Sequence, residues 1–102
     1  MEYEREVERY LKDRIEAEGG LCWKFTSPGT QGVPDRWCVL KGMQFFVELK
    51  RAHGRLSKVQ KFQIDQLQER GVTVYVIRSK TDVDDLIYDL THYRYFFSEG
   101  GQ

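Results

Sequence analysis

The sequence lacks long hydrophobic runs: no apolar stretch approaches the ~18 residues that a membrane-spanning helix needs. Its N-terminus is charged and amphipathic, which is not typical of a secretory signal. Cysteine is scarce, with two in 102 residues, and neither a C-x-x-C pair nor a close histidine pair is present. We therefore expect a cytoplasmic protein with Cys22 and Cys38 as buried free thiols. A zinc site made of Cys22, Cys38, His53 and His92 is the less favoured alternative.

Net charge is also absent, because 16 basic and 16 acidic residues cancel. The balance hides an uneven distribution. Residues 19–64 contain eight bases and only two acids, a net charge of +6, whereas residues 1–18 and 65–102 each carry −3. A polyanionic partner fits the middle segment. On charge alone, a solvated basic face is the simpler interpretation.

What the sequence does have is enough apolar residues, 40%, for one buried core, and a pattern of seven elements without linkers or repeats. Val7, Leu11 and Ile15 recur at helical spacing, Ser57 is a favourable helix N-cap, and the run from Val72 to Ile77 is typical of a buried central strand. We expect helices over 3–18, 57–70 and 81–90, the last opened by an acidic capping box at 81–84, and strands over 21–25, 36–40, 44–50 and 72–77. The order α-β-β-β-α-β-α predicts an α/β (α+β) domain with a mixed central β-sheet flanked by helices.

Polar residues occur where this pattern calls for apolar ones. In the strand that ends at Lys50, alternation places Phe46, Glu48 and Lys50 on one face and Phe45, Val47 and Leu49 on the other. A charge in so apolar a strand is costly unless it is paired or binds a metal. An ion pair at the strand end is the simpler explanation for Glu48 and Lys50 taken alone.

Asp35 extends this group. It follows Gly32-Val33-Pro34, and Pro34 restricts the backbone, so the loop should deliver Asp35 rigidly to the start of a strand. If that strand and the next form an antiparallel hairpin, Asp35 lies near Glu48 and Lys50. Two neighbouring carboxylates repel each other, and a divalent cation is the usual reason for tolerating them.

Two further polar side chains fall on predicted packing faces. Glu4 lies in the first turn of the first helix, in line with its apolar stripe, where it either favours the helix dipole or needs an inward partner such as a metal site. Gln60 lies on the packing face of the second helix, just after a basic loop. That helix start could bind a phosphate through its free amides.

The ordered set of Glu4, G-V-P-D ending at Asp35, E-L-K at 48–50 and L-S-K-V-Q ending at Gln60 resembles the PD-(D/E)XK nuclease superfamily and, within it, the VRR-NUC domain. The pattern of that domain is a helix Glu, G-x-P-D, E-x-K and S-x-x-Q. Each short motif is weak alone, but four of them in order form a strong signal. The resemblance spans residues 4–78 of a single domain over 1–102 and leaves the aromatic tail, within 91–102, unassigned. It implies a restriction-endonuclease-like core.

The resemblance also implies roles. Asp35 and Glu48 would ligate one or two Mg²⁺ ions, with Mn²⁺ as a substitute, together with the backbone carbonyl of Leu49. Glu4 would support this site directly or through a water. Lys50 would orient or deprotonate the attacking water, and Gln60 would place the water or the phosphate. The residues expected to bind the nucleic-acid backbone are Lys24, Arg51, His53, Arg55, Lys58 and Lys61.

We therefore expect a metal-dependent DNA endonuclease that acts as a homodimer, selects branched or four-way DNA, and works in the cytoplasm, or in the host cytoplasm if it is phage-encoded. The aromatic tail at 93–97 is a candidate dimer surface, and packing on the domain's own sheet is the alternative. The rival function is a non-catalytic DNA- or junction-binding module that retains the fold. An RNA-directed nuclease is a third, weaker reading.

Overall fold

The computed structural model describes the backbone of residues 3–100 and the side chains of residues 3–92. Its elements follow the predicted order α-β-β-β-α-β-α, which is confirmed. The helices are α1 (Glu4–Ala17), α2 (Lys58–Glu69) and α3 (Lys80–Gly100), and the strands are β1 (Leu21–Lys24), β2 (Arg36–Leu40), β3 (Met43–Leu49) and β4 (Val74–Ile77).

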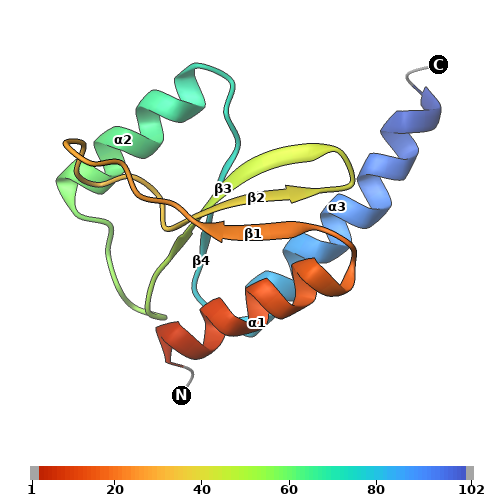
Figure 1. Cartoon of the computed structure of the whole chain (residues 1–102), viewed down its shortest axis with the longest axis horizontal. Coiled ribbons are helices and arrows are strands. Elements are labelled where there is room, and N and C mark those ends of the chain that lie inside the picture. Colours follow the sequence, from red (N-terminus) through yellow and green to blue (C-terminus); the bar gives the residue numbers. More distant parts are fainter. Residues whose placement is uncertain (1–2, 101–102) are drawn as a thin grey trace.

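The four strands form one mixed sheet in the order β1-β2-β3-β4 (Figure 1). Strand β2 pairs antiparallel with β1 and with β3, whereas β4 pairs with β3 in parallel after the crossover through α2. The prediction of a central strand at 72–77 is therefore wrong, because β4 lies at the edge of this sheet. Its apolar residues are explained by helix packing on β4 rather than by strands on both sides: Val74 and Ile77 are buried.

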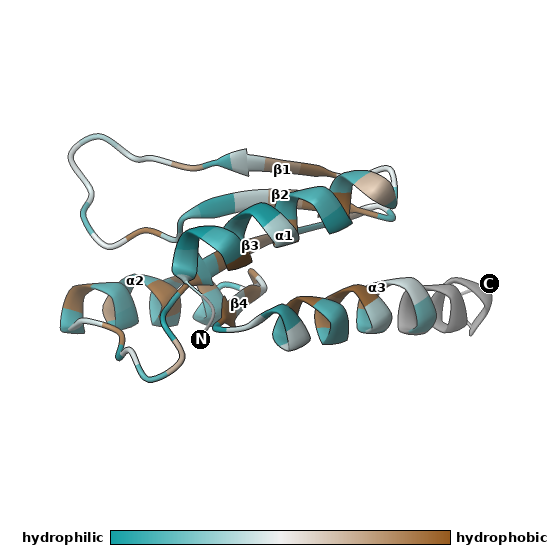
Figure 2. Ribbon diagram, turned by 90° about the horizontal axis from the view of Figure 1, so that it is seen from below, coloured by the Kyte–Doolittle hydropathy of each residue, from teal (hydrophilic) through white to brown (hydrophobic). Residues whose placement is uncertain are grey.

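The helices cover different faces of the sheet. Buried side chains of α1 and α3 form one hydrophobic core with the strands, and in β3 this core takes the predicted set of Phe45, Val47 and Leu49. Helix α2 lies on the other side of the sheet (Figure 1). Figure 2 shows the hydrophobic segments concentrated on the strands and on parts of the helices, while much of α1 is hydrophilic. Glu48 and Phe46, two residues apart, belong to the α2 side.

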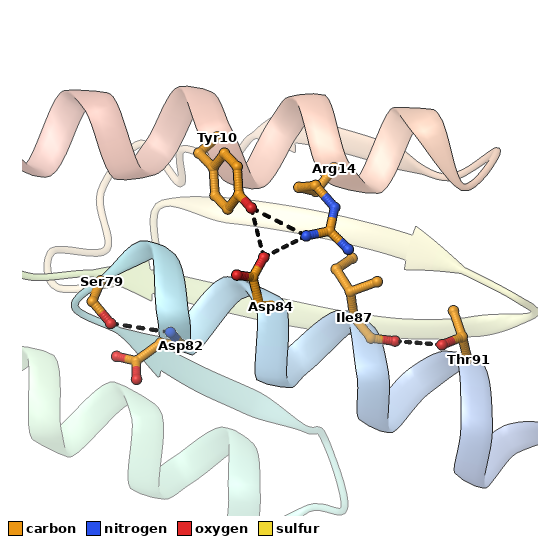
Figure 3. Close-up of polar contacts among 7 residues, drawn as sticks. All are labelled: Tyr10, Arg14, Ser79, Asp82, Asp84, Ile87 and Thr91. Atoms are coloured by element: carbon orange, nitrogen blue, oxygen red, sulfur yellow. Dashed lines mark hydrogen bonds and ion pairs between the residues drawn. The ribbon is translucent and has the colours of Figure 1, made fainter.

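A polar cluster joins the two helices of the core layer. Tyr10 of α1 donates a hydrogen bond of 2.6 Å to Asp84 of α3, and Arg14 forms an ion pair with the same carboxylate (Figure 3). Arg14 also donates to the Tyr10 hydroxyl. Because Arg14 and Asp84 are substantially exposed, we expect this cluster to fix the orientation of α3 rather than to add much stability.

The start of α3 differs from its prediction. The helix begins at Lys80, and its cap is Ser79, whose hydroxyl accepts a hydrogen bond from the Asp82 amide (Figure 3). Thr81 already lies inside the helix, so a capping box at 81–84 is wrong. Ser79 is two residues nearer to β4 than Thr81. Because its hydroxyl can satisfy a free amide at the helix start, the loop after β4 is shorter and α3 begins earlier than predicted. The side chains of the aromatic tail at 93–97 lie outside the described residues.

Two further observations concern expectations from composition. Cys22 and Cys38 are buried free thiols, as predicted, with their sulfur atoms 3.5 Å apart on adjacent strands. Among the described residues, the helices are too short or too polar to cross a membrane.

Candidate active site

The candidate site begins with a buried carboxylate. Glu48 lies near the end of β3, a central strand, and only 1% of it is exposed to solvent. Strand alternation turns it away from the core of α1 and α3 and towards α2. A buried carboxylate is costly unless its charge is compensated, so the surroundings of Glu48 decide what the site can do.

Asp35 lies beside Glu48, as the hairpin predicted. The register pairs Arg36 with Val47, so Asp35 falls opposite Glu48. One oxygen of Asp35, Oδ2, accepts a hydrogen bond of 2.8 Å from the Leu49 amide. That bond ties the loop to β3 and holds the carboxylate at the strand end.

The loop before Asp35 needs its glycine. Gly32 has φ +85°, and a β-carbon there would lie 2.8 Å from the carbonyl oxygen of Val59 in α2. The loop therefore packs directly on the start of α2, with Pro34 buried behind it. The G-V-P-D motif thus connects α2 to the carboxylate of Asp35 through backbone contact.

Lys50 and Gln60 complete the cluster around Glu48. The Lys50 ammonium is 3.9 Å from Glu48 Oε2, and the Gln60 amide donates a hydrogen bond of 3.2 Å to the same oxygen. Gln60 is itself held by a capping box: its amide oxygen accepts from the Ser57 backbone, and the Ser57 hydroxyl accepts from the Gln60 backbone. The start of α2 therefore fixes the position of Gln60 against Glu48.

The electrostatics of the site favour a bound cation. Burial, and then the negative charge of Asp35, raise the pKa of Glu48 to about 7, although Lys50 opposes this shift. Glu48 Oε1, in contrast to Oε2, is buried without a hydrogen-bond partner in the part of the chain that the structure describes. Hard divalent cations prefer carboxylate and carbonyl oxygens. The unpartnered oxygen beside a second carboxylate therefore fits such an ion, which Asp35 and Glu48 could hold.

The structure gives less support to the remaining members of the predicted metal site, Glu4 and the Leu49 carbonyl. Glu4, the first residue of α1, is exposed rather than inward-facing, because no earlier turn of the helix covers it. Its charge still contributes to the raised pKa of Glu48, so Glu4 lies near the end of β3 that carries Glu48. Within residues 3–92, groups of three or more Asp, Glu, His or Cys side chains in a metal-binding arrangement do not occur. Metal binding by Asp35, Glu48, Glu4 and the Leu49 carbonyl therefore stays a prediction.

The comparisons with known proteins agree with this geometry. The family model described as the VRR-NUC domain matches residues 21–81, which run from β1 to the start of α3. A solved structure described as "VRR_NUC domain" superposes with a TM-score of 0.78 at 36% sequence identity, over 88% of this chain and 96% of that one. A curated phage protein named "Putative nuclease p44", from Acyrthosiphon pisum secondary endosymbiont phage 1, is 35% identical over 76% of this chain and 84% of its own length.

The chain belongs to the VRR-NUC family. It is a nuclease-type domain with the VRR-NUC fold, and the resemblance drawn from its four short motifs is confirmed. The matched range includes Asp35, Glu48, Lys50 and Gln60, whereas Glu4 precedes it.

The predicted backbone-binding residues of this VRR-NUC domain lie on its surface. All six are exposed, and five of them cluster in sequence between the end of β3 and the first turns of α2. Two already have acidic neighbours: Lys24 is 3.8 Å from Glu8, and Lys61 is 3.1 Å from Asp65. The six are Lys24, Arg51, His53, Arg55, Lys58 and Lys61.

One supporting contact was missed by sequence reasoning. Arg36, adjacent to Asp35, is buried and donates a hydrogen bond of 2.8 Å to Glu8 of α1 and another to the Cys22 carbonyl. This pairing ties α1 to the start of β2, next to the site. Its signal was available: Arg36 alternates with Cys38 and Leu40, so it belongs to the core face and needs a partner there.

Proposed function

We propose that this VRR-NUC domain is a metal-dependent DNA endonuclease in which Asp35 and Glu48 hold Mg²⁺, or Mn²⁺ in its place. The observation that carries the proposal is the buried Glu48 with its free Oε1 beside Asp35, and with the Lys50 ammonium 3.9 Å from its other oxygen. A binding module without catalysis would not need a buried carboxylate whose ionised form is this unfavourable.

A divalent ion bound there would polarise a phosphodiester and lower the pKa of a bound water, so that a nucleophile is available at neutral pH. The chain's own residues then have separate tasks. Lys50 places a positive charge beside the carboxylates, where it can orient the attacking water and stabilise negative charge on the scissile phosphate. Gln60 holds Glu48 through Oε2, which leaves Oε1 free. Asp35 is oriented by the Leu49 amide.

The basic surface supports a nucleic-acid substrate. Arg51, His53, Arg55, Lys58 and Lys61 follow directly after the site in sequence, and they are exposed. Phosphate contacts of this kind position a duplex without reading its sequence. We therefore infer selection by DNA structure, with branched or four-way DNA cut by a homodimer that carries two sites, in the cytoplasm of the cell or of the phage host.

The test is a cleavage assay on matched linear, flapped and four-way DNA, and on RNA of the same sequence, in EDTA, Mg²⁺ or Mn²⁺. Cutting should need the metal, favour branched DNA over linear DNA and RNA, and disappear in Asp35→Ala. Light scattering of the same preparation should give the mass of a dimer. Binding to DNA without cutting under any metal would contradict the proposal and favour a non-catalytic junction-binding module.

A further inference from the structure

The α2 side of the sheet carries a row of aromatic side chains that the proposed reaction does not use. The strand register places Trp23 of β1 opposite Trp37 of β2, and Trp37 opposite Phe46 of β3. Alternation along β3 puts Phe46 on the same face as Glu48, and along β2 it puts Trp37 on the same face as Asp35. The aromatic row therefore lies two residues, about 7 Å, from the row of carboxylates.

The row is open to solvent at Trp23, while Trp37 and Phe46 are half-buried. Trp23 is 56% exposed, and its ring centroid lies 5.3 Å from that of Trp37 at an interplanar angle of 50°. Phe46 lines two cavities, of which only the second is also lined by residues of α2. One of about 340 Å³ is also lined by Trp37 and by the turn before β4, and the other, of about 280 Å³, is also lined by Phe25. The α2 side of the sheet thus presents aromatic rings beside two cavities, two residues along the strands from the candidate active site.

The polar groups around this surface match the chemistry of a nucleobase. Side-chain amides and a hydroxyl line the two cavities beside the aromatic rings, from Gln44, Thr73, Gln63 and Gln66. Arg70 adds a cation at one cavity, and Lys24, with a 74% exposed side chain, follows Trp23. Flat apolar rings with amides and nearby cations are the groups that bind unpaired bases by stacking and hydrogen bonding.

We propose that Trp23 and Trp37 form a stacking platform for an unpaired base beside the scissile phosphate, so that the preferred substrate carries unpaired nucleotides at the cleavage point. This inference rests on the proposed function, because it takes the Asp35–Glu48 pair as the place of the phosphate. A base next to that phosphate needs to reach only two residues, about 7 Å, along the strands to meet the rings. A paired base is held in its own stack and cannot reach the rings.

The chain's own fluorescence provides the readout, because Trp23 and Trp37 are the two tryptophans in the sequence. We would titrate the full chain in EDTA, where no metal supports cleavage, with a short oligothymidylate. The control is an abasic oligodeoxyribose phosphate of equal length and charge at the same ionic strength. The oligothymidylate should quench the emission, and the abasic chain should leave it nearly unchanged. Equal quenching by both would overturn the proposal.

Matched variants separate stacking from folding. Trp23→Ala should weaken binding of the oligothymidylate about 10- to 100-fold and binding of the abasic chain hardly at all. Trp23→Phe should retain most of the affinity. Tyr88→Ala is the control, because Tyr88 is equally exposed at 55% but belongs to α3, in the other layer. Unchanged affinity in Trp23→Ala would overturn the inference.

The outcomes also separate this inference from the proposed function. Base-dependent quenching without cleavage under any metal would support the platform and contradict the nuclease. Metal-dependent cleavage with identical quenching by both oligomers would do the reverse. If light scattering shows that Trp23→Ala splits a dimer while the quenching does not depend on bases, the row is a contact between two copies and the proposal is wrong.

Discussion

At the scale of single residues, Glu48 controls the behaviour of the site. Its two carboxylate oxygens have different environments: Oε2 accepts from Gln60 and lies near Lys50, whereas Oε1 is buried without a partner among the described residues. An ion that binds Oε1 relieves the cost of this arrangement. Without one, the protein should favour the protonated form, as the raised pKa of Glu48 indicates.

The first prediction is a pH dependence of stability in EDTA. Because the pKa of Glu48 rises from 4.5 to about 7 in the folded protein, the unfolded chain releases this proton first. The contribution of Glu48 to the free energy of unfolding should therefore fall as pH rises from about 4.5 to 7, by up to about 3 kcal/mol, and stay low above pH 7. Urea melts of the wild type and Glu48→Gln should show this slope only in the wild type. Parallel curves would contradict the assignment.

The second prediction concerns Lys50. Removal of its charge in Lys50→Ala should lower the rate of metal-dependent cleavage at least about 100-fold, because a positive group beside the phosphate is lost where charge develops. Binding of the same DNA in Ca²⁺ should change little, since many exposed basic side chains still contact the phosphates. Lys12→Ala, on α1 and in an ion pair with Glu16, is the control for loss of one charge. Full activity of Lys50→Ala would remove Lys50 from the reaction.

At the scale of elements, the start of α2 connects helix capping to the site. Ser57 and Gln60 cap each other, and the same Gln60 side chain reaches Glu48. Helix α3 has a comparable serine cap, Ser79. Its hydrogen bond from the Asp82 amide does not involve Asp35 or Glu48. The two serines therefore allow helix capping to be separated from positioning.

The third prediction uses this pair. Ser57→Ala and Ser79→Ala should each lower the free energy of unfolding by about 1 kcal/mol, the usual cost of losing an N-cap. Only Ser57→Ala should also lower cleavage, because it frees Gln60 and so loosens Glu48. Thermal melts and cleavage rates of the two proteins in parallel provide the check. Equal activity in both variants would show that Gln60 needs no cap.

Much of the site followed from local sequence. Alternation places Glu48 opposite the core face, Pro34 limits where Asp35 points, and Ser57 is the expected N-cap of α2. These inferences succeeded because each depends on spacing within one element or across one short turn.

Long-range arrangement could not be read in the same way. The aromatic row depends on the pairing of β1 with β2, and the long loop between these strands does not fix their register. The edge position of β4 was missed because a β-branched run is typical of any strand buried by helices, at the centre or the edge. The contact between Arg36 and Glu8 joins residues 28 positions apart, which periodicity does not predict.

At the scale of the whole molecule, a neutral chain concentrates its positive charge in the segment that contains the site. Residues 19–64 carry a net charge of +6, although the chain as a whole carries none. The charge therefore supports a local contact with a polyanion rather than long-range attraction of the entire protein.

The fourth prediction is a change in salt dependence. Arg55→Ala and Lys58→Ala should each weaken DNA binding and reduce the slope of log affinity against log salt concentration by about 1, because one phosphate contact and its released counterion are lost. Lys12→Ala is the control: Lys12 lies on α1, in an ion pair with Glu16. A slope that equals the wild-type value would remove Arg55 or Lys58 from the DNA contact.

Cleavage by this domain requires that Asp35 and Glu48 bind a divalent ion, as proposed above. The direct measurement is a calorimetric titration of Mn²⁺ into the DNA-free protein at pH 8, beside Asp35→Asn and Glu48→Gln. We predict that the wild type binds, with weaker binding at pH 6 where the ion must displace the proton of Glu48, and that both variants lose at least about tenfold in affinity. Equal binding by all three proteins, or none by the wild type, would contradict the account.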